Sequence, residues 1–385
     1  MRLIFYYCNY STLGHCATVF SLVKRLKKAF KAKIKIVVIE VGIKETKLFP
    51  FDKYSKFYFY PLVKNNSSAF NIGVSAISRK KFNFLKNIAS DFRPDVFVTD
   101  YYPFSRHIGY QGFEHFLKYL KNKFGSKIVC SSPYLNWTDQ LYETIRVYYD
   151  LILFHFPKEF LSVGDKYLPK QGLRSLNRTV DAHSKKIRFT GFIFDKKDGV
   201  ILKKSVKNKL GLRNEKLIVV SRGGRSECEK LIPSAFWLAK EHRNWFFLIS
   251  SGPSLDRQKF NKYRKIAKQL GNVKLERVIY PDFEDYLKAA DLSINMAGYN
   301  TMVKLLYFHK RTIVIPIDNT DQLINAAFSS NFIPCKIIKK NGLEPKVLEK
   351  RVEQVLSMKF KPGIYPKNNW FNGIDSTVRL IGGLF

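Results

Sequence analysis

Acidic residues are scarce in this chain: among its 385 residues, 31 Asp and Glu stand against 67 Lys and Arg, so that the formal net charge is +36. Solubility alone does not require so large a charge. We therefore expect an anionic partner, such as phosphorylated substrates, anionic lipid or nucleic acid. A general lysine-rich bias of the proteome is the alternative explanation, and composition does not separate the two.

Cysteines and long apolar runs are also in short supply. The five cysteines are scattered, odd in number and without a Cys-x-x-Cys pair, which fits a reducing cytosol and argues against a zinc site. No apolar run reaches the length of a membrane-spanning helix, and the N-terminus leads into an expected strand without a cleavable signal pattern. We expect a cytoplasmic protein, peripheral on the inner face of the cell membrane, that does not span it.

What the chain does contain is an alternation of apolar runs and helical segments in both halves, which indicates an α/β protein. The hydrophobic content of 45% supports substantial cores, and the length favours two domains. We expect two Rossmann-like domains facing a cleft. The predicted boundaries are a first domain at 1–190, a linker at 191–214, a second domain at 215–373, and a C-terminal helix at 374–385 that packs back at the interface.

One stretch, residues 291–308, has the pattern strand, turn and helix, and a second β-branched run follows at 312–317. Ala297-Gly298 predicts a tight turn where a ligand can approach the backbone, and Asn300 or Thr301 is expected to cap the helix. Backbone N–H groups at such a helix start form an anion site. The alternative interpretation is an ordinary βαβ crossover without a ligand.

The first half offers two candidate proton acceptors. His15 follows the first expected strand and the loop that contains Gly14, and Asp100 lies at the end of the expected strand 96–99, where ligands of open α/β sheets gather. His15 is alternatively a helix-capping or buried polar residue, and Asp100 an N-cap. We favour His15 as the base and Asp100 as the residue that orients it or the acceptor.

These motifs resemble GT-B glycosyltransferases, especially the branch of the lipid-linked N-acetylglucosaminyltransferase of peptidoglycan synthesis and its uncharacterised "predicted glycosyltransferase" relatives. The resemblance rests on the turn at 297–301, on Pro316 and on the loop 321–326, which ends in Asn-Ala. Gly14-His15 matches the end of the family's Gly-x-Gly-His loop, with Thr12 in place of its first glycine. The loop at 101–104 is similar to the relatives' Pro-Phe loop. The family's ribose-binding Glu corresponds here to Lys304.

The resemblance implies transfer of a hexosyl or N-acetylhexosaminyl group from a nucleotide sugar, expected to be UDP-linked, to a polyprenyl-phosphate-linked or cell-envelope acceptor. No cofactor is expected beyond this donor substrate. The acceptor side would include Gly14, Tyr101 and Tyr102. Donor-binding candidates are Arg222, Gly223, Gly224, Gly252, Tyr280, Gly298, Tyr299, Asn300, Thr301, Lys304, Asp321, Gln322 and Asn325. Within this set, Tyr280 would contact the base through its backbone, and residues 321, 322 and 325 would line the sugar.

The chain has no Asp-x-Asp, the closely spaced carboxylates of a metal-dependent transferase, so we expect a metal-independent reaction. Glycine amides, arginines and a helix terminus would stabilise the departing diphosphate instead. Lys304 either reaches a phosphate, selects another nucleotide, or marks a chain that no longer binds one. A nucleotide-sugar hydrolase is the alternative function. A nucleic-acid-binding protein is favoured only by charge, and no recognition module is visible.

Overall fold

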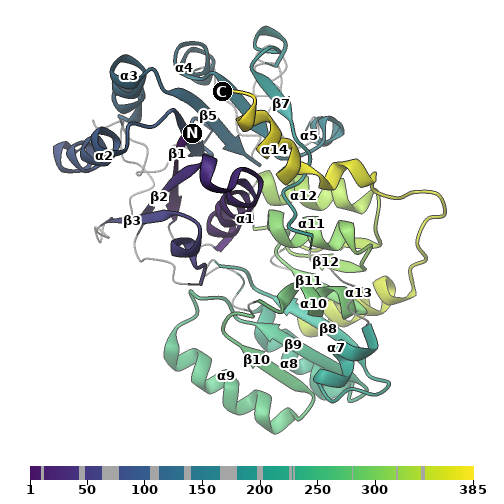
Figure 1. Ribbon diagram of the computed structural model, residues 1–385. Coiled ribbons are helices and arrows are strands. Elements are labelled where there is room, and N and C mark those ends of the chain that lie inside the picture. Colours follow the sequence, from purple (N-terminus) through teal and green to yellow (C-terminus); the bar gives the residue numbers. More distant parts are fainter. Residues whose placement is uncertain are drawn as a thin grey trace. The chain divides into compact units, whose positions relative to one another are not determined.

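The computed structural model describes two compact units, each built around one parallel sheet (Figure 1). Unit 1 comprises Met1–Asp195 with Asn368–Phe385, and unit 2 comprises Lys196–Lys367. The described residues are 1–9, 13–42, 48–62, 78–104, 112–133, 140–164, 180–196, 203–224, 228, 230–279, 281–317, 320–339 and 343–385.

The sheet of unit 1 has seven strands in the order β3-β2-β1-β4-β5-β6-β7, and all neighbours pair in parallel. Most are apolar runs buried on both faces, as parallel sheets covered by helices require. The strands are β1 (Arg2–Asn9), β2 (Lys35–Gly42), β3 (Lys56–Pro61), β4 (Val96–Asp100), β5 (Lys127–Ser132), β6 (Leu151–Phe154) and β7 (Ile187–Phe189).

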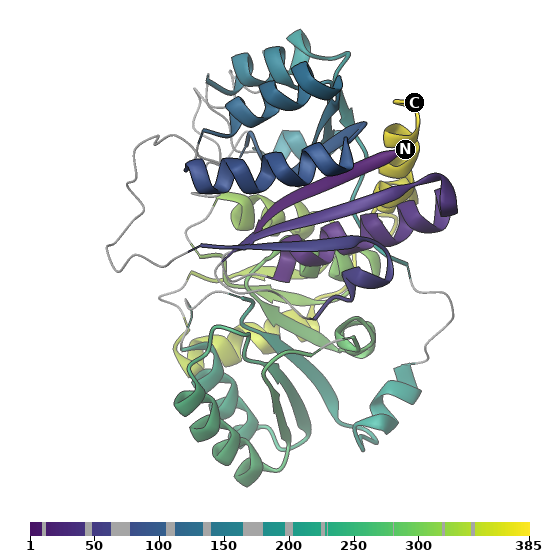
Figure 2. The same ribbon diagram turned by 60° about the vertical axis from the view of Figure 1, so that its left-hand side comes forward.

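The helices of unit 1 cover both faces of its sheet. Crossovers leave β1 and β4 in opposite directions along the sheet, and right-handed connections therefore place their helices on opposite faces. One row packs α2 against α3 and α3 against α4, while α1 packs with α14 (Figure 2). The helices are α1 (Leu13–Phe30), α2 (Arg79–Phe92), α3 (Phe113–Phe124), α4 (Gln140–Tyr148), α5 (Leu161–Gly164) and α14 (Gly373–Gly382).

Unit 2 repeats this architecture with six parallel strands in the order β10-β9-β8-β11-β12-β13. Its strands are β8 (Lys216–Ser221), β9 (Trp245–Ser250), β10 (Val273–Glu276), β11 (Leu292–Asn295), β12 (Thr312–Val314) and β13 (Cys335–Ile337). Its helices are α7 (Lys203–Lys209), α8 (Leu231–Glu241), α9 (Arg257–Leu270), α10 (Phe283–Ala289), α11 (Tyr299–Tyr307), α12 (Thr320–Ser330) and α13 (Pro345–Ser357).

The C-terminal segment belongs to unit 1. The Phe192 N–H donates to the Trp370 carbonyl at 2.5 Å, and Gly191, with φ of 83°, would place a Cβ 2.6 Å from the same oxygen. Arg25 on α1 pairs with Asp375 on α14 at 2.6 Å, and a Cβ at Gly382 would meet the Phe30 ring at 2.6 Å. Residues 368–385 therefore complete the first unit.

The observed units differ from the predicted domains in three ways. The chain passes from one unit to the next at Asp195, inside the predicted linker, and α7 gives that linker a helix of unit 2. The return to unit 1 comes at Asn368, ahead of the predicted 374, because the 3₁₀ turn at Asn368–Phe371 already buries Trp370 and Phe371.

Among the described residues, no helix is long and apolar enough to cross a membrane.

Candidate functional site

The first half of the site lies where the strand order of unit 1 reverses. β1 is paired with both β2 and β4, so crossovers diverge from this point, and ligands of open α/β sheets bind outside the carboxyl ends of the strands at such a point. Asp100 is the last residue of β4, and His15 is in the first turn of α1, which follows β1. The helix starts at Leu13, so Gly14 and His15 are helical and not part of the predicted loop.

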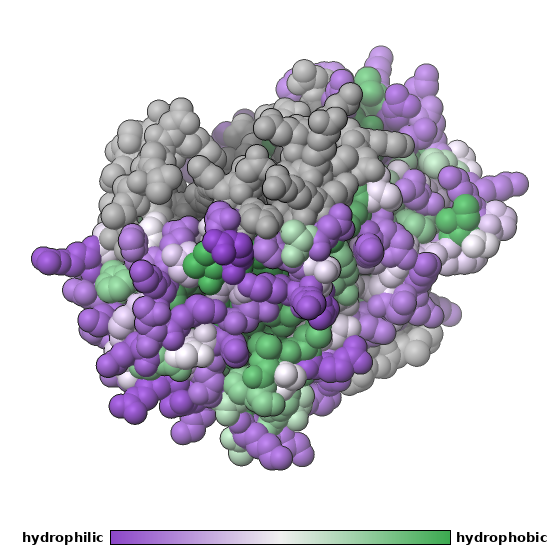
Figure 3. Space-filling view, turned by 90° about the horizontal axis from the view of Figure 1, so that it is seen from above, coloured by the Kyte–Doolittle hydropathy of each residue, from purple (hydrophilic) through white to green (hydrophobic). Residues whose placement is uncertain are grey.

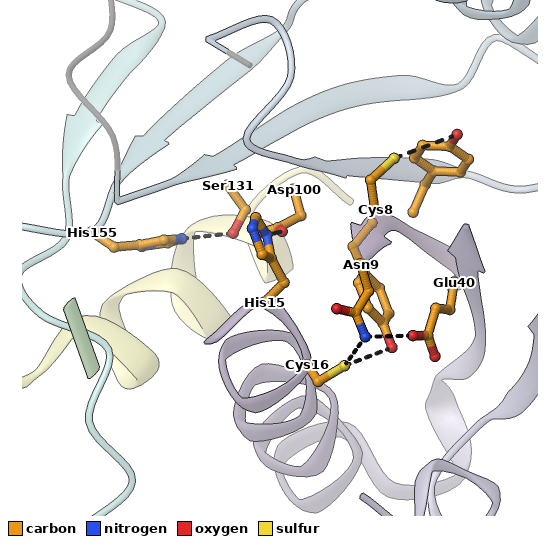
Figure 4. A network of polar contacts seen from close by, with 10 residues as sticks. Cys8, Asn9, His15, Cys16, Glu40, Asp100, Ser131 and His155 are labelled. Carbon is orange, nitrogen blue, oxygen red and sulfur yellow. Dashed lines mark hydrogen bonds and ion pairs between the residues drawn. The ribbon is translucent and has the colours of Figure 1, made fainter. Parts of the chain in front are cut away.

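His15 and Asp100 form a hydrogen-bonded pair (Figure 4): His15 Nδ1 lies 2.5 Å from Asp100 Oδ2. The side chain of Asp100 is fully buried, whereas that of His15 is 17% exposed. The carboxylate accepts a hydrogen bond from Nδ1–H, which leaves the lone pair of His15 Nε2 as the position on the ring that can take up a proton. Asp100 does not cap a described helix; α3, the next one along the chain, has Gly112 at its N-cap.

Burial and the neighbouring His15 shift the pKa of the Asp100 carboxyl in opposite directions. Burial raises the pKa of the Asp100 carboxyl, and the charge and hydrogen bond of His15 lower it, with burial the larger effect. The geometry thus suits His15 as the group that takes up a proton and Asp100 as the group that orients it.

The two tyrosines predicted on the acceptor side have different positions. The Tyr101 ring lies against the His15 ring with centroids 4.1 Å apart, and Tyr101 has φ of 68°, unusual for a residue with a side chain. Tyr102 is 4% exposed and its hydroxyl donates to Glu114 on α3. Tyr101 therefore borders the pair, whereas Tyr102 is part of the packing between β4 and α3.

A second buried network beside the pair was not predicted from the sequence. His155, fully buried, has its Nδ1 2.9 Å from Thr190 Oγ1 and its Nε2 2.7 Å from Ser131 Oγ. Thr190 Oγ1 also lies within hydrogen-bond distance of the carbonyls of Phe154 and Gly191, which can only accept. Thr190 Oγ1 therefore accepts a hydrogen bond from His155 Nδ1–H, and His155 Nε2 accepts one from Ser131. Ser131 is the register partner of Asp100 on β5.

A third group of polar contacts in the same view joins the end of β1 to β2 and α1 (Figure 4). The side-chain amide of Asn9 donates to the buried Glu40 at 2.7 Å and lies 3.4 Å from Cys16 Sγ. The Tyr7 hydroxyl is 3.3 Å from the same sulfur, and burial raises the pKa of Tyr7 far above its ordinary value. These contacts fix the end of β1 and the start of α1, and hence the position of His15.

Unit 2 has the equivalent reversal of strand order between β8 and β11. The loop after β8 contains Arg222, which is 1% exposed and donates to the Ser251 carbonyl at 2.7 Å and to Ser254 Oγ at 2.9 Å. Gly252 has φ of 78°, and a Cβ there would lie 1.9 Å from the Gly223 carbonyl oxygen. Arg222 is therefore a cation that ties the β8 and β9 loops together, with Gly223 and Gly224 following it on the partly exposed side.

The turn between β11 and α11 is held by two asparagines. Asn295 Oδ1 accepts from the Ala297 N–H at 2.9 Å, and the Asn325 amide donates to the Ala297 carbonyl at 3.1 Å. Ala297, not Gly298, carries the positive φ, at 53°. Gly298 is exposed and has an ordinary φ of −64°, and a Cβ added to it would meet no atom within 4 Å, so open space lies before the helix.

The predicted capping of α11 is wrong, and the remaining predicted donor residues lie on α11, on α12 or outside the described residues. Gly298 is the N-cap residue of α11, so Asn300 and Thr301 lie in its first turn with Tyr299, and neither is the cap. The Gln322 side chain accepts from the Ile317 N–H at 2.7 Å, and Asn325 supports the turn. Asp321 is in the first turn of α12, Lys304 is a partly exposed residue of α11, and Tyr280 lies outside the described residues.

Comparison with known proteins supports the resemblance. Residues 217–370 match the glycosyltransferase family 28 C-terminal domain. A relative from Caldicellulosiruptor saccharolyticus is 28% identical over 162 residues, or 40% of this chain and 42% of its own length. Its name is UDP-N-acetylglucosamine--N-acetylmuramyl-(pentapeptide) pyrophosphoryl-undecaprenol N-acetylglucosamine transferase. The chain thus spans less than half the length of this relative.

Solved structures match the whole chain. The structure of Acinetobacter baumannii MurG has a TM-score of 0.56 at 12% identity and covers 98% of this chain and 99% of its own. The Neisseria meningitidis UDP-GlcNAc 2-epimerase bound to UDP-GlcNAc has a TM-score of 0.64 at 14% identity, with full coverage of both chains. The predicted GT-B fold of two Rossmann-like halves is confirmed. The predicted resemblance to the branch of the lipid-linked N-acetylglucosaminyltransferase of peptidoglycan synthesis is confirmed as well.

The buried His155 generates a prediction about acid stability. Burial lowers its pKa from 6.5 to about 3, so below pH 6.5 the unfolded chain gains a proton that the folded chain does not. Unit 1 should therefore lose stability as the pH falls, by at most about 2 kcal/mol between pH 6.5 and about pH 5 from this residue.

Denaturant unfolding of the wild type and of His155→Gln at both pH values measures this effect. Glutamine can donate and accept but does not titrate, so the variant should be less stable near neutral pH and show a flatter pH dependence. The exposed His115→Gln is the matched control and should keep the wild-type slope. An unchanged slope in His155→Gln would assign the acid sensitivity to other groups.

Proposed function

We propose that the protein is a glycosyltransferase that moves a sugar from a nucleotide-sugar donor to a hydroxyl of a lipid-linked or cell-envelope acceptor. The observation that carries the proposal is the His15–Asp100 pair at the strand reversal of unit 1, together with the family 28 domain match of unit 2. The named relative transfers N-acetylglucosamine from a UDP donor, which favours the same donor class here.

In the proposed reaction, the acceptor hydroxyl oxygen attacks the anomeric carbon of the donor sugar. His15 Nε2 takes the hydroxyl proton as the new C–O bond forms, and the bond from the anomeric carbon to the diphosphate oxygen breaks. Asp100 accepts the Nδ1–H bond throughout, so that it fixes the ring and stabilises the positive charge that develops on it. The leaving nucleoside diphosphate carries away the electron pair.

The developing diphosphate charge needs fixed donors and cations, which we assign to unit 2. The start of α11 follows β11 at the strand reversal, and the partial positive charge of a helix N-terminus favours a phosphate there. Arg222 adds a cation that its bonds to the β9 loop hold in place. Preorganised groups of this kind stabilise a leaving group without reorganisation, and we propose that the reaction needs no metal.

The sequence allows three roles for Lys304: contact with a phosphate, selection of another nucleotide, or loss of nucleotide binding. It is on α11, the helix whose N-terminus we assign to the diphosphate, and its side chain is partly exposed. Lys304→Glu would restore the residue usual in the resembling family. A rise in uridine nucleotide affinity would indicate lost ribose recognition, and a fall would indicate that the lysine contacts the ligand.

A membrane-borne acceptor is consistent with the charge of the chain. The net charge is +36, and α1 ends in a lysine-rich segment, with Lys24, Lys27, Lys28, Lys31 and Lys33 in or just after it. The face shown in Figure 3 is mostly hydrophilic and has a smaller cluster of hydrophobic residues. Anionic lipid attracts basic segments with on the order of 1 kcal/mol for each nearby lysine. We therefore propose peripheral association with anionic membrane, with no nucleic acid as partner.

Hydrolysis of the nucleotide sugar is the alternative, with water in place of the acceptor. The fold does not separate transfer from other chemistry, because a 2-epimerase has a similar structure. The test is a product analysis: nucleotide sugars are screened for nucleotide release with and without a lipid extract of a bacterial envelope. A glycosylated lipid supports transfer, free sugar regardless of lipid supports hydrolysis, and absence of both products contradicts the proposal.

Replacing the base should affect turnover far more than donor binding. His15→Ala removes the proton acceptor, and kcat should fall by about 10² to 10⁴ while the affinity for the donor nucleotide stays nearly unchanged. Asp100→Asn should be milder, because the imidazole remains. The exposed His115→Ala is the control and should have wild-type kcat. A larger loss in Asp100→Asn than in His15→Ala would make the carboxylate the base.

The donor assignment predicts the outcome of a blocking substitution. Gly298→Leu should leave the fold intact, because φ is ordinary and no atom lies within 4 Å of the added Cβ, yet it should abolish nucleotide-induced thermal stabilisation. Glu344→Leu is a matched control, since Glu344 is also a helix N-cap, with φ of −61° and ψ of 134°. Undiminished thermal shifts with uridine diphosphate in Gly298→Leu would remove this turn from the donor site.

A further inference from the structure

A histidine and two glutamates more than 100 positions further along the chain come together between α8 and α13 of unit 2. His242 follows the last residue of α8, and Glu349 and Glu353 are one turn apart on α13. One ligand atom from each lies within 4.8 Å of the other two. These residues belong to the helix-covered face of the sheet that carries α8, because α13 packs against α8.

The imidazole of His242 is held in a fixed orientation. Its ring stacks on the Trp245 indole with centroids 3.8 Å apart and an angle of 5° between the planes. The backbone on both sides is also tied down, since the His242 N–H donates to the Leu238 carbonyl at 2.9 Å and the Trp245 N–H donates to the His242 carbonyl at 3.0 Å. Nε2 consequently points at α13, where it lies 2.7 Å from Glu349 Oε1.

The two carboxylates occupy positions i and i+4 of α13, which face the same side of the helix. Like charges at this spacing repel each other, and a single imidazole neutralises at most one of them. Glu349 is half-buried against the imidazole, while Glu353 is exposed. Zinc binds both imidazole nitrogen and carboxylate oxygen in proteins, and a site with three protein ligands leaves a fourth position for water.

We propose that His242, Glu349 and Glu353 bind a divalent transition-metal ion, with Zn²⁺ as the ion that fits the ligands best. His242 Nε2 and one oxygen from each glutamate would coordinate it, and small side-chain rotations would bring the three atoms to the distances that zinc requires. Mg²⁺ suits the site poorly, because it prefers oxygen ligands in an octahedron.

The expectation that this chain holds no zinc rested on its cysteines, and it does not extend to this donor set. The proposed site is formed by elements outside the strand reversal between β8 and β11, so the ion would not take part in the transfer chemistry. It would instead link the end of α8 to α13, and binding to the folded form alone would stabilise unit 2. This proposal does not depend on the proposed enzymatic function.

The test is a titration of the intact protein with Zn²⁺, followed by calorimetry and by the unfolding midpoint. The wild type should bind one ion at this site and gain stability, while an equal concentration of Mg²⁺ should leave the midpoint unchanged. Glu353→Gln should weaken Zn²⁺ binding by at least about tenfold without loss of the fold, since its side chain is exposed. His242→Gln should have a similar effect on binding.

Glu344→Gln is the matched control, because it removes a carboxylate at the N-cap of the same helix and should keep wild-type affinity. Co²⁺ serves as a spectroscopic probe: nitrogen and oxygen ligands give visible bands without the thiolate charge-transfer band that binding to a cysteine would produce. No binding by the wild type, unchanged affinity in Glu353→Gln, or a thiolate band would each overturn the proposal.

Discussion

Parallel pairing of β1 with both β2 and β4, and of β8 with both β9 and β11, is the constraint on which the rest of the structure depends. Crossovers leave these strand pairs in opposite directions, and the carboxyl ends at such a point of divergence are where open α/β sheets bind ligands. His15 and Asp100 meet there in unit 1, and the Arg222 loop and the start of α11 meet there in unit 2. Strand order thus determines which side chains are available for chemistry.

Much of the fold could be predicted because buried parallel strands are continuous apolar runs. The predicted strand at 96–99 agrees with β4 to within one residue, and the β-branched run at 312–317 contains β12. β3 and β13 were not predicted: both are edge strands, one ending in Pro61 and the other only three residues long, so neither has the pattern of a buried strand. The early start of α1 was missed because Gly14 is a poor helix former and favoured a loop, although Thr12, just before the helix, is of a type that commonly caps helices.

The candidate site could be predicted only where position along a strand decided it. Asp100 and His15 follow strands, and their meeting follows from strand order. The partners of Asn325 and Arg222 depend on loop geometry that no local pattern records; each is bonded to backbone of a neighbouring loop. His155 gave no signal because its partners, Ser131 and Thr190, come from other strands and are distant in sequence.

Because residues 368–385 pack on unit 1, the two units are completed in a fixed order during translation. A ribosome delivers residues 196–367 before this last segment, so unit 2 can acquire its whole sheet while α1 still lacks its partner α14. Until this segment is made, the side of α1 that packs against α14 stays uncovered. Gly191 and Phe192 also lack their contacts with Trp370 during this time. Completion of the internal unit before the one that begins the chain reverses the usual N-terminal-first sequence of folding during translation.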